Sequence, residues 1–111
     1  MEYERARALL REERDRVERL LAETEAAGLD DRREANQGGD LTDPAERLTA
    51  EESDDAVAAG LRERLAAIER AEHRIEQGVY GYSVRSGLPL PDERLEADPA
   101  AELTVDEARA T

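Results

Sequence analysis

Two long stretches of helix-forming residues, separated by one short cluster of helix breakers, constrain this chain more than any other feature. Residues 2–27 contain neither glycine nor proline, and a second helical stretch is expected over residues 44–77. The cluster Asn36–Asp40 between them has the sequence Asn-Gln-Gly-Gly-Asp, a composition that interrupts helices. The chain is therefore expected to form two helices and to change direction between them. The first helix is expected to end either at Gly28 or near Ala35.

Both stretches carry apolar side chains at seven-residue spacing, which places them on one face of a helix. These are Tyr3, Leu10 and Val17 in the first stretch and Leu61, Ile68 and Ile75 in the second. Antiparallel packing would cover both stripes at once. We therefore predict a mainly α protein whose residues 1–78 form a long antiparallel two-helix coiled-coil hairpin, with its tip near residues 36–45. Pro44 fits the first position of the second helix.

The last third of the chain has a different composition. Gly78 is expected to end the second helix, and glycine and proline are frequent up to Pro91. One short helical turn is predicted over 92–97. A last helix is predicted over 104–110, because Thr104 and Glu107 have the spacing of a capping box. Residues 79–111 are thus predicted to form a second, small and turn-rich module.

Charge and cysteine content restrict the partners and the chemistry. The 111 residues carry 29 acidic and 16 basic side chains, for a formal charge of −13. Binding to duplex nucleic acid requires basic side chains that neutralise the phosphates. A protein partner with a basic surface is therefore favoured over sequence-specific DNA contact.

The chain has no cysteine, which excludes disulfides and thiolate metal sites. No apolar run approaches the roughly 20 residues of a membrane span, and the charged start predicts no signal peptide. A cytoplasmic location is expected.

Several ordered motifs are shared with a known family. They are Asp40-x-x-Asp43-x-Ala45, then Arg74-Ile75-Glu76-x-Gly78-x-Tyr80-Gly81-Tyr82, Ser83-x-x-Ser86-Gly87, Arg94-Leu95-Glu96-Ala97-Asp98-Pro99, and Leu103-Thr104-x-x-Glu107. On these motifs the chain resembles the DksA/TraR family of bacterial RNA polymerase-binding factors over residues 37–109. The resemblance implies a hairpin whose acidic tip enters the polymerase secondary channel. Asp40 and Asp43 would contact basic or polar groups there, and Ala45 would permit close approach.

The tip motif has a second possible register, Asp43-x-x-Glu46-x-Leu48, which matches the family less completely. On the residues alone, Asp40 and Asp43 are also ordinary loop and helix-capping residues. The family's alarmone-binding basic residues would correspond to Gly60, Ala67 and Ala108, which cannot pair with a phosphate. No such response is expected from this chain.

Members of the family usually bind zinc through four cysteines in the C-terminal module. The resemblance places Ser83, Ser86, Thr104 and Glu107 at these positions. Hydroxyls stay protonated near neutral pH, and one carboxylate cannot hold a structural zinc. We predict a degenerate zinc-finger-like module without metal, held by hydrogen bonds; the alternative is an unusual metal site completed by His73 or Asp106. Its apolar residues are expected to form a small core, namely Ile75, Val79, Tyr80, Tyr82, Val84, Leu88, Leu90, Leu95, Leu103 and Val105.

Nothing in the chain indicates catalysis or a cofactor. His73 is the one histidine and is expected at the surface, so no Ser-His-Asp arrangement can be built. Arg62, Arg64, Arg70 and Arg74 are expected on a solvated helix face. The leading hypothesis is a monomeric, non-enzymatic transcription regulator that binds bacterial RNA polymerase through the hairpin tip to modulate initiation. The alternative is a structural or adaptor coiled coil that uses the hairpin on a different protein partner.

Overall fold

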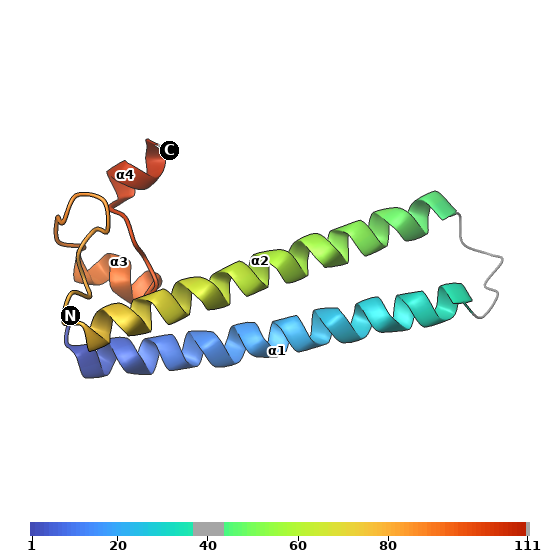
Figure 1. Ribbon diagram of the computed structural model, residues 1–111, viewed down its shortest axis with the longest axis horizontal. Helices are drawn as coiled ribbons and strands as arrows, with labels where there is room; N and C mark the ends of the chain where they lie inside the picture. The colour runs from blue at the N-terminus through green and yellow to red at the C-terminus, as the bar shows by residue number, and fades with distance from the viewer. Residues whose placement is uncertain (37–43, 111) are drawn as a thin grey trace. The chain divides into compact units, whose positions relative to one another are not determined.

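The computed structural model describes the backbone of residues 1–36 and 44–110, and the side chains of residues 1–28 and 54–110. Four helices follow one another in this part of the chain (Figure 1). They are α1 (Tyr3–Asn36), α2 (Pro44–Glu76), α3 (Asp92–Ala97) and α4 (Val105–Arg109). The predicted mainly α fold is confirmed. Among the described residues the only β pairing is an isolated antiparallel bridge between Tyr82 and Pro89.

The chain divides into two compact units. The first, here called the terminal unit, contains Met1–Asp15 and Leu65–Thr111. The second, the middle unit, contains Arg16–Arg64. The beginning of α1 and the end of α2 therefore group with the turn-rich module. The division expected from the sequence, a hairpin to residue 78 and a module from 79, remains a prediction.

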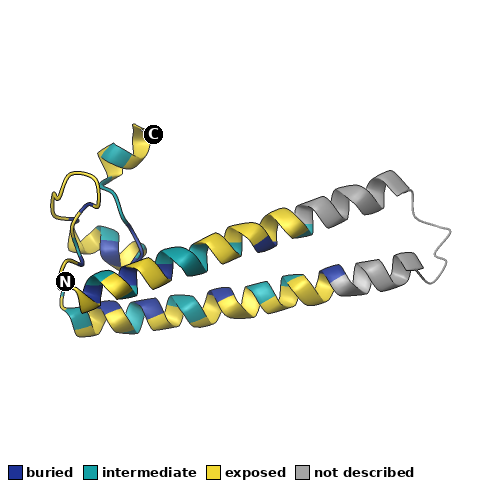
Figure 2. Ribbon diagram, in the orientation of Figure 1, coloured by how far each residue is buried: buried dark blue, intermediate teal, exposed yellow. Residues whose placement is uncertain are grey.

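The core of the terminal unit combines small and large apolar side chains. Leu10, Ile68 and Leu95 are the largest fully buried ones. The remaining buried apolar residues of this unit are Ala6, Ala71, Ile75, Tyr80, Leu90, Ala100 and Ala101. Alanines at the contact allow two helices to approach closely. Figure 2 shows buried positions recurring along the helices and in the module of this unit.

Contacts within the terminal unit fix the direction of its two long helical segments. The rings of Tyr3, at the start of α1, and Tyr80, just after α2, form a T-shaped pair with 6.1 Å between the centroids. Further along α1, Arg14 forms an ion pair with Glu72 of α2. The partner position moves back along α2 as α1 advances, so the two segments are antiparallel. The predicted hairpin pairing is confirmed in this unit.

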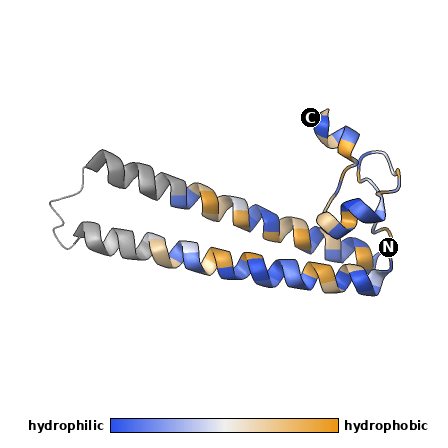
Figure 3. Ribbon diagram, turned by 180° about the vertical axis from the view of Figure 1, so that it is seen from behind, coloured by the Kyte–Doolittle hydropathy of each residue, from blue (hydrophilic) through white to orange (hydrophobic). Residues whose placement is uncertain are grey.

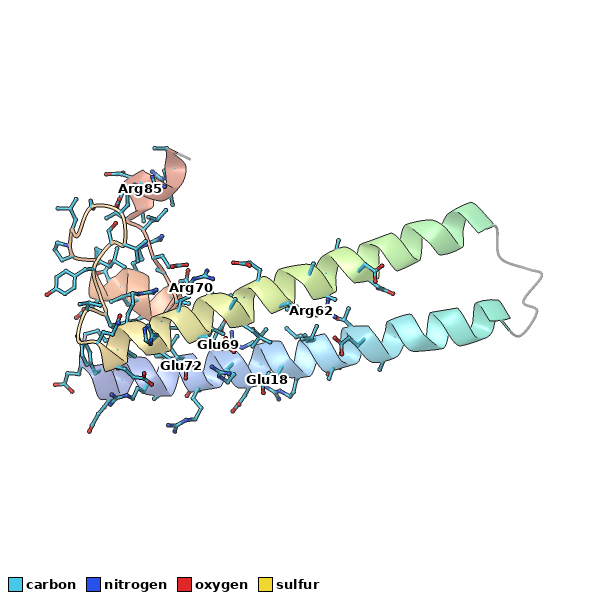
Figure 4. The ribbon with its side chains drawn as sticks, viewed as in Figure 1. Glu18, Arg62, Glu69, Arg70, Glu72 and Arg85 are labelled. Carbon is cyan, nitrogen blue, oxygen red and sulfur yellow. The ribbon has the colours of Figure 1, made fainter. Side chains whose placement is uncertain are left out.

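The middle unit has fewer buried apolar side chains among those described. Val17 and Ala58 are buried, whereas Leu20 and Val57 are about half exposed. Arg62 of α2 donates to the Glu25 carboxylate of α1 at 2.8 Å. Figure 4 labels Arg62 on α2.

Of the two ends expected for the first helix, the later one is correct, since α1 continues past Gly28 to Asn36. Hydropathy alternates along these segments in the pattern of an amphipathic helix (Figure 3).

Backbone hydrogen bonds explain where α2 ends. Gly78 has a φ of 74°, a left-handed conformation that glycine adopts without steric cost. The Gly78 N–H donates to the Ile75 carbonyl at 3.1 Å, and the Val79 N–H donates to the Arg74 carbonyl at 2.9 Å. These two bonds form a Schellman motif, which satisfies carbonyls left over at the helix end. The predicted stop at Gly78 is confirmed.

The expected small core of the module is only partly correct. Tyr80, Leu90 and Leu95 are buried with Ile75, as predicted. Five other members are instead exposed to solvent, namely Val79, Tyr82, Val84, Leu88 and Val105. For Tyr82 and Val84 the physical reason lies at Ser83, which stands between them, is 4% exposed and turns inward. Tyr82 pairs with Pro89 in extended backbone, where adjacent side chains point to opposite faces, and Val84 lies in the turn that follows.

Candidate functional site

The predicted tip motif lies largely outside the described residues. Asp40 and Asp43 belong to the segment 37–43, which is not described. Ala45 lies in the first turn of α2, but its side chain is not described. The partner-binding role of these three residues therefore remains a prediction. No described helix is long and apolar enough to cross a membrane.

The four positions where relatives are expected to carry cysteine come together around one carboxylate. The Glu107 carboxylate accepts hydrogen bonds from the Ser83 hydroxyl at 2.9 Å and from the Ser86 hydroxyl at 3.2 Å. It also accepts the backbone N–H of Thr104 at 3.1 Å. The Thr104 hydroxyl in turn accepts the Glu107 N–H at 3.1 Å, which completes the predicted capping box of α4. We call these four residues the Glu107 cluster.

The turn that carries the two serines is closed by further bonds. The Ser83 hydroxyl oxygen accepts the backbone N–H groups of Arg85 and Ser86, each at 3.1 Å. The Gly87 N–H donates to the Ser83 carbonyl at 2.9 Å, and the Ser83 N–H donates to the Leu88 carbonyl at 2.7 Å. These bonds hold the serine hydroxyls toward α4. Hydrogen bonds to protein atoms thus cross-link the turn to α4.

Electrostatics favour an ionised Glu107. Desolvation acts to raise the pKa of this carboxyl, but hydrogen bonds from Ser83, Thr104 and Ser86 outweigh it and lower the pKa below its usual value. Each of these donors stabilises the charged form more than the neutral one. The carboxylate is therefore the form that the cluster is built to hold at neutral pH.

The donor set of the Glu107 cluster does not fit a zinc ion. The serine hydroxyls keep their protons and donate hydrogen bonds to Glu107, whereas structural zinc sites are built from thiolate sulfur and neutral imidazole nitrogen. His73, weighed as an additional ligand, is exposed in the last turn of α2, 3.8 Å from Glu76. Among the described residues no group of three or more His, Cys, Asp or Glu side chains has the geometry to hold a metal ion. The absence of metal remains a prediction.

A second charged group joins α2 to the segment before α4. The Glu102 carboxylate accepts from Arg70 at 2.9 and 3.3 Å and from Arg74 at 3.4 Å. Arg70 is half exposed, and Figure 4 labels it on α2. The Arg74 side chain is only 12% exposed, so the expectation of a solvated arginine is wrong there. Helical spacing alone does not show this, because Arg74 is covered by residues that come later in the sequence.

Comparison with known proteins finds relatives that are about one third identical to this chain. The chain is 34% identical over 102 residues to the RNA polymerase-binding transcription factor DksA of Caulobacter vibrioides. The matched region covers 88% of this chain and 61% of that protein. It is 35% identical over 66 residues to general stress protein 16O of Bacillus subtilis, covering 60% of this chain and 40% of that protein. The chain thus spans about three fifths or less of the length of these curated relatives. No family model matches the chain.

A solved structure gives the same fold. Transcription factor DksA2 from Pseudomonas aeruginosa matches with a TM-score of 0.53 and 23% identity, covering 93% of this chain and 82% of that one. Two long helices followed by a small turn-rich module define the class of helical-hairpin proteins with a zinc-finger-like module. Within this class, the sequence similarity over most of its length makes the chain a member of the DksA family.

Proposed function

We propose that this protein is a non-enzymatic transcription regulator that binds bacterial RNA polymerase. The observation that carries the proposal is the 34% identity, over 88% of the chain, to a relative named as an RNA polymerase-binding transcription factor. The order of the shared motifs and the DksA2-like fold support it. The acidic composition fits a protein partner with a basic surface.

We further propose that the hairpin tip enters the polymerase secondary channel and modulates initiation from there. Asp40 and Asp43 would form charge-assisted hydrogen bonds with basic or polar groups of the polymerase, and the small Ala45 would allow the helix start to approach them. In a desolvated channel, truncating one partner of such a pair costs about 2–5 kcal/mol. This places most of the proposed specificity in two carboxylates.

The remaining features of the proposal follow from charge and sequence. The protein would act as a monomer in the cytoplasm, without a cofactor and without base-specific DNA contact. A formal charge of −13 disfavours close approach to phosphates. Gly60, Ala67 and Ala108 offer no cation at the positions matched to alarmone binding, so regulation by that ligand is not proposed.

The test is binding to purified bacterial RNA polymerase, with transcription from a defined promoter as the second readout. Asp40→Asn/Asp43→Asn should weaken binding at least about tenfold, since two charge-assisted contacts are lost. Glu2→Gln/Glu4→Gln is the matched control, because it removes the same charge from exposed positions at the start of the chain. Equal binding by both double variants would remove the tip from the mechanism.

The alternative is an adaptor that uses the hairpin on a different protein partner. It is supported by one observation: the positions where the family is expected to carry cysteine hold the hydrogen-bonded Glu107 cluster instead. If the unmodified protein does not bind polymerase well above cellular concentration, the regulator proposal fails and the adaptor proposal stands.

A further inference from the structure

Exposed apolar side chains concentrate in the turn between α2 and α3. Among the described residues, seven large hydrophobic side chains are exposed, and four of them lie within residues 79–88. These four are Val79 (49% exposed), Tyr82 (51%), Val84 (56%) and Leu88 (56%). Figure 2 shows this turn as largely exposed. A group of apolar side chains gathered in one short segment is a mark of an interaction surface, whereas single exposed ones are ordinary.

Three of these side chains line a cleft. Val79, Tyr82 and Val84 surround a cavity of about 310 Å³ together with Arg74, Ser83 and Gly87. All six residues belong to the terminal unit. The volume is at the lower end of ligand-binding clefts, enough for one or two amino-acid side chains. Gly87 has a φ of 76°, so the backbone conformation that closes this side of the cleft is one that glycine adopts without strain.

The cleft also contains an incompletely neutralised cation. Arg74 contacts the Glu102 carboxylate at 3.4 Å, while Arg70 shares the same carboxylate at the shorter distance of 2.9 Å. The Nη2 atom of Arg74 is buried and has no hydrogen-bond partner among the residues that the structure describes. Burial lowers the pKa of Arg74, and the attraction of Glu102 offsets this only in part. A buried guanidinium with an unused donor favours a further acceptor, above all a carboxylate.

We propose that this cleft docks a segment of a partner protein in which an apolar side chain stands next to an Asp or Glu carboxylate. The apolar side chain would cover Val79 and Val84 and pack on the Tyr82 ring. A small rotation of the Arg74 side chain would bring its free donor to the carboxylate. Aromatic and arginine residues together are the usual anchors of protein interfaces. The proposal goes beyond the hairpin-tip function and does not depend on it.

Charge distinguishes this partner from other polyanions. Nucleic acid and anionic membranes are bound through several clustered cations, whereas this cleft has one arginine in its lining and the chain carries a formal charge of −13. A single carboxylate beside an apolar group matches both the number of cations and the apolar lining.

The experiment is a titration of the uniformly ¹⁵N-labelled full chain, followed by amide chemical shifts. The probes are N-acetyl-Leu-Asp-amide and its neutral counterpart N-acetyl-Leu-Asn-amide. The Asp probe should cause saturable shifts at Val79, Tyr82, Ser83, Val84 and Gly87. The Asn probe should bind about tenfold more weakly, because a hydrogen bond to a charged acceptor is replaced by a neutral one.

Variants of exposed side chains keep the test independent of folding. Tyr82→Ser and Val84→Ser should each reduce binding of the Asp probe several-fold, and Val57→Ser, which changes a similarly exposed side chain of the middle unit, should not. Absence of saturable shifts, equal binding of the two probes, or an equal effect of Val57→Ser would overturn the proposal. Shifts of the same amides with protein concentration, without probe, would show that a second copy occupies the cleft and would also overturn it.

Discussion

At the scale of single residues, the Glu107 carboxylate joins two parts of the module. It accepts hydrogen bonds from the hydroxyls of Ser83 and Ser86 in the serine turn and from the backbone N–H of Thr104 at the N-terminus of α4. A metal ion in a zinc finger does the same by binding ligands from two segments. Here the cross-link consists of hydrogen bonds, so its strength depends on the protonation of a single carboxyl group.

Replacing Glu107 by Gln should lower the thermal midpoint at neutral pH. Because the folded-state pKa of Glu107 is lowered, its contribution to stability is present above the ordinary value of 4.5 and is lost as the pH falls through the folded-state pKa. The difference between wild type and Glu107→Gln should therefore shrink on acidification. Thermal unfolding followed by circular dichroism from pH 7 to pH 3 measures it. Asp106→Asn, an exposed change of the same charge in α4, is the control and should have a smaller effect.

Tyr80 is the second residue whose protonation matters. Its buried hydroxyl donates to the Pro99 carbonyl at 2.7 Å, and burial raises its pKa to about 12, with Arg74 acting in the opposite direction. Tyr80→Phe should cost about 0.5–1.5 kcal/mol of unfolding free energy in urea. Because the folded-state pKa of Tyr80 is raised, the stabilisation by its hydroxyl is fully present below pH 10.0 and is lost as the pH rises through about 12. Tyr82→Phe is the control, since that side chain is half exposed. An equal loss of unfolding free energy in both variants would contradict a stabilising role of the buried Tyr80 hydroxyl.

At the scale of elements, most boundaries are predictable because glycine, proline and capping residues act locally. The sequence predicts the second helix over 44–77, and it lies at Pro44–Glu76; two residues suffice to predict the Thr104 capping box. The orientation of Tyr82 and Val84 is not predictable, since it follows from the inward turn of Ser83 toward Glu107, 24 residues later. Burial of Arg74 likewise depends on distant residues. Local patterns determine helix ends, whereas side-chain direction depends on tertiary contacts.

Two glycines near α2 should respond in opposite directions to the same substitution. Gly60 lies inside the helix, where an added methyl group would meet no atom within 4 Å, so Gly60→Ala should stabilise by about 0.5–1 kcal/mol. Gly78 has a φ of 74°, so Gly78→Ala should destabilise by about 1–2 kcal/mol through the left-handed backbone. Urea unfolding of both variants measures the two effects. A loss of stability in both would show that Gly60 has a packing role that its surroundings do not reveal.

At the scale of the whole molecule, the stability of the two units should differ. Ten of the buried apolar side chains belong to the terminal unit, whereas Val17 and Ala58 belong to the middle unit among the residues described. Each buried large apolar side chain contributes about 1.5–3 kcal/mol, so residues 1–15 and 65–110 gain more from burial than the described residues 16–28 and 54–64. Segments with few buried apolar contacts open at lower free energy. Residues 16–28 and 54–64 are therefore expected to open more readily than the terminal unit.

Native-state hydrogen exchange tests this difference within single helices. In α1, amides of residues 16–28 should exchange faster than those of residues 7–15, and in α2 residues 54–64 should exchange faster than residues 65–76. The comparison is internal, because both halves of each helix share the same solvent and helix type. Ile68→Ala truncates a fully buried side chain of the terminal unit. It should lower the free energy of opening measured by exchange in residues 7–15 and 65–76 by about 2–5 kcal/mol, and their amides should exchange correspondingly faster. Val57→Ala, at an exposed position, should leave both sets nearly unchanged. Uniform protection along residues 7–28 of α1 and 54–76 of α2 would mean that the two units unfold as one. The smaller number of buried apolar side chains among residues 16–28 and 54–64 would then be offset by ion pairs such as Arg62–Glu25.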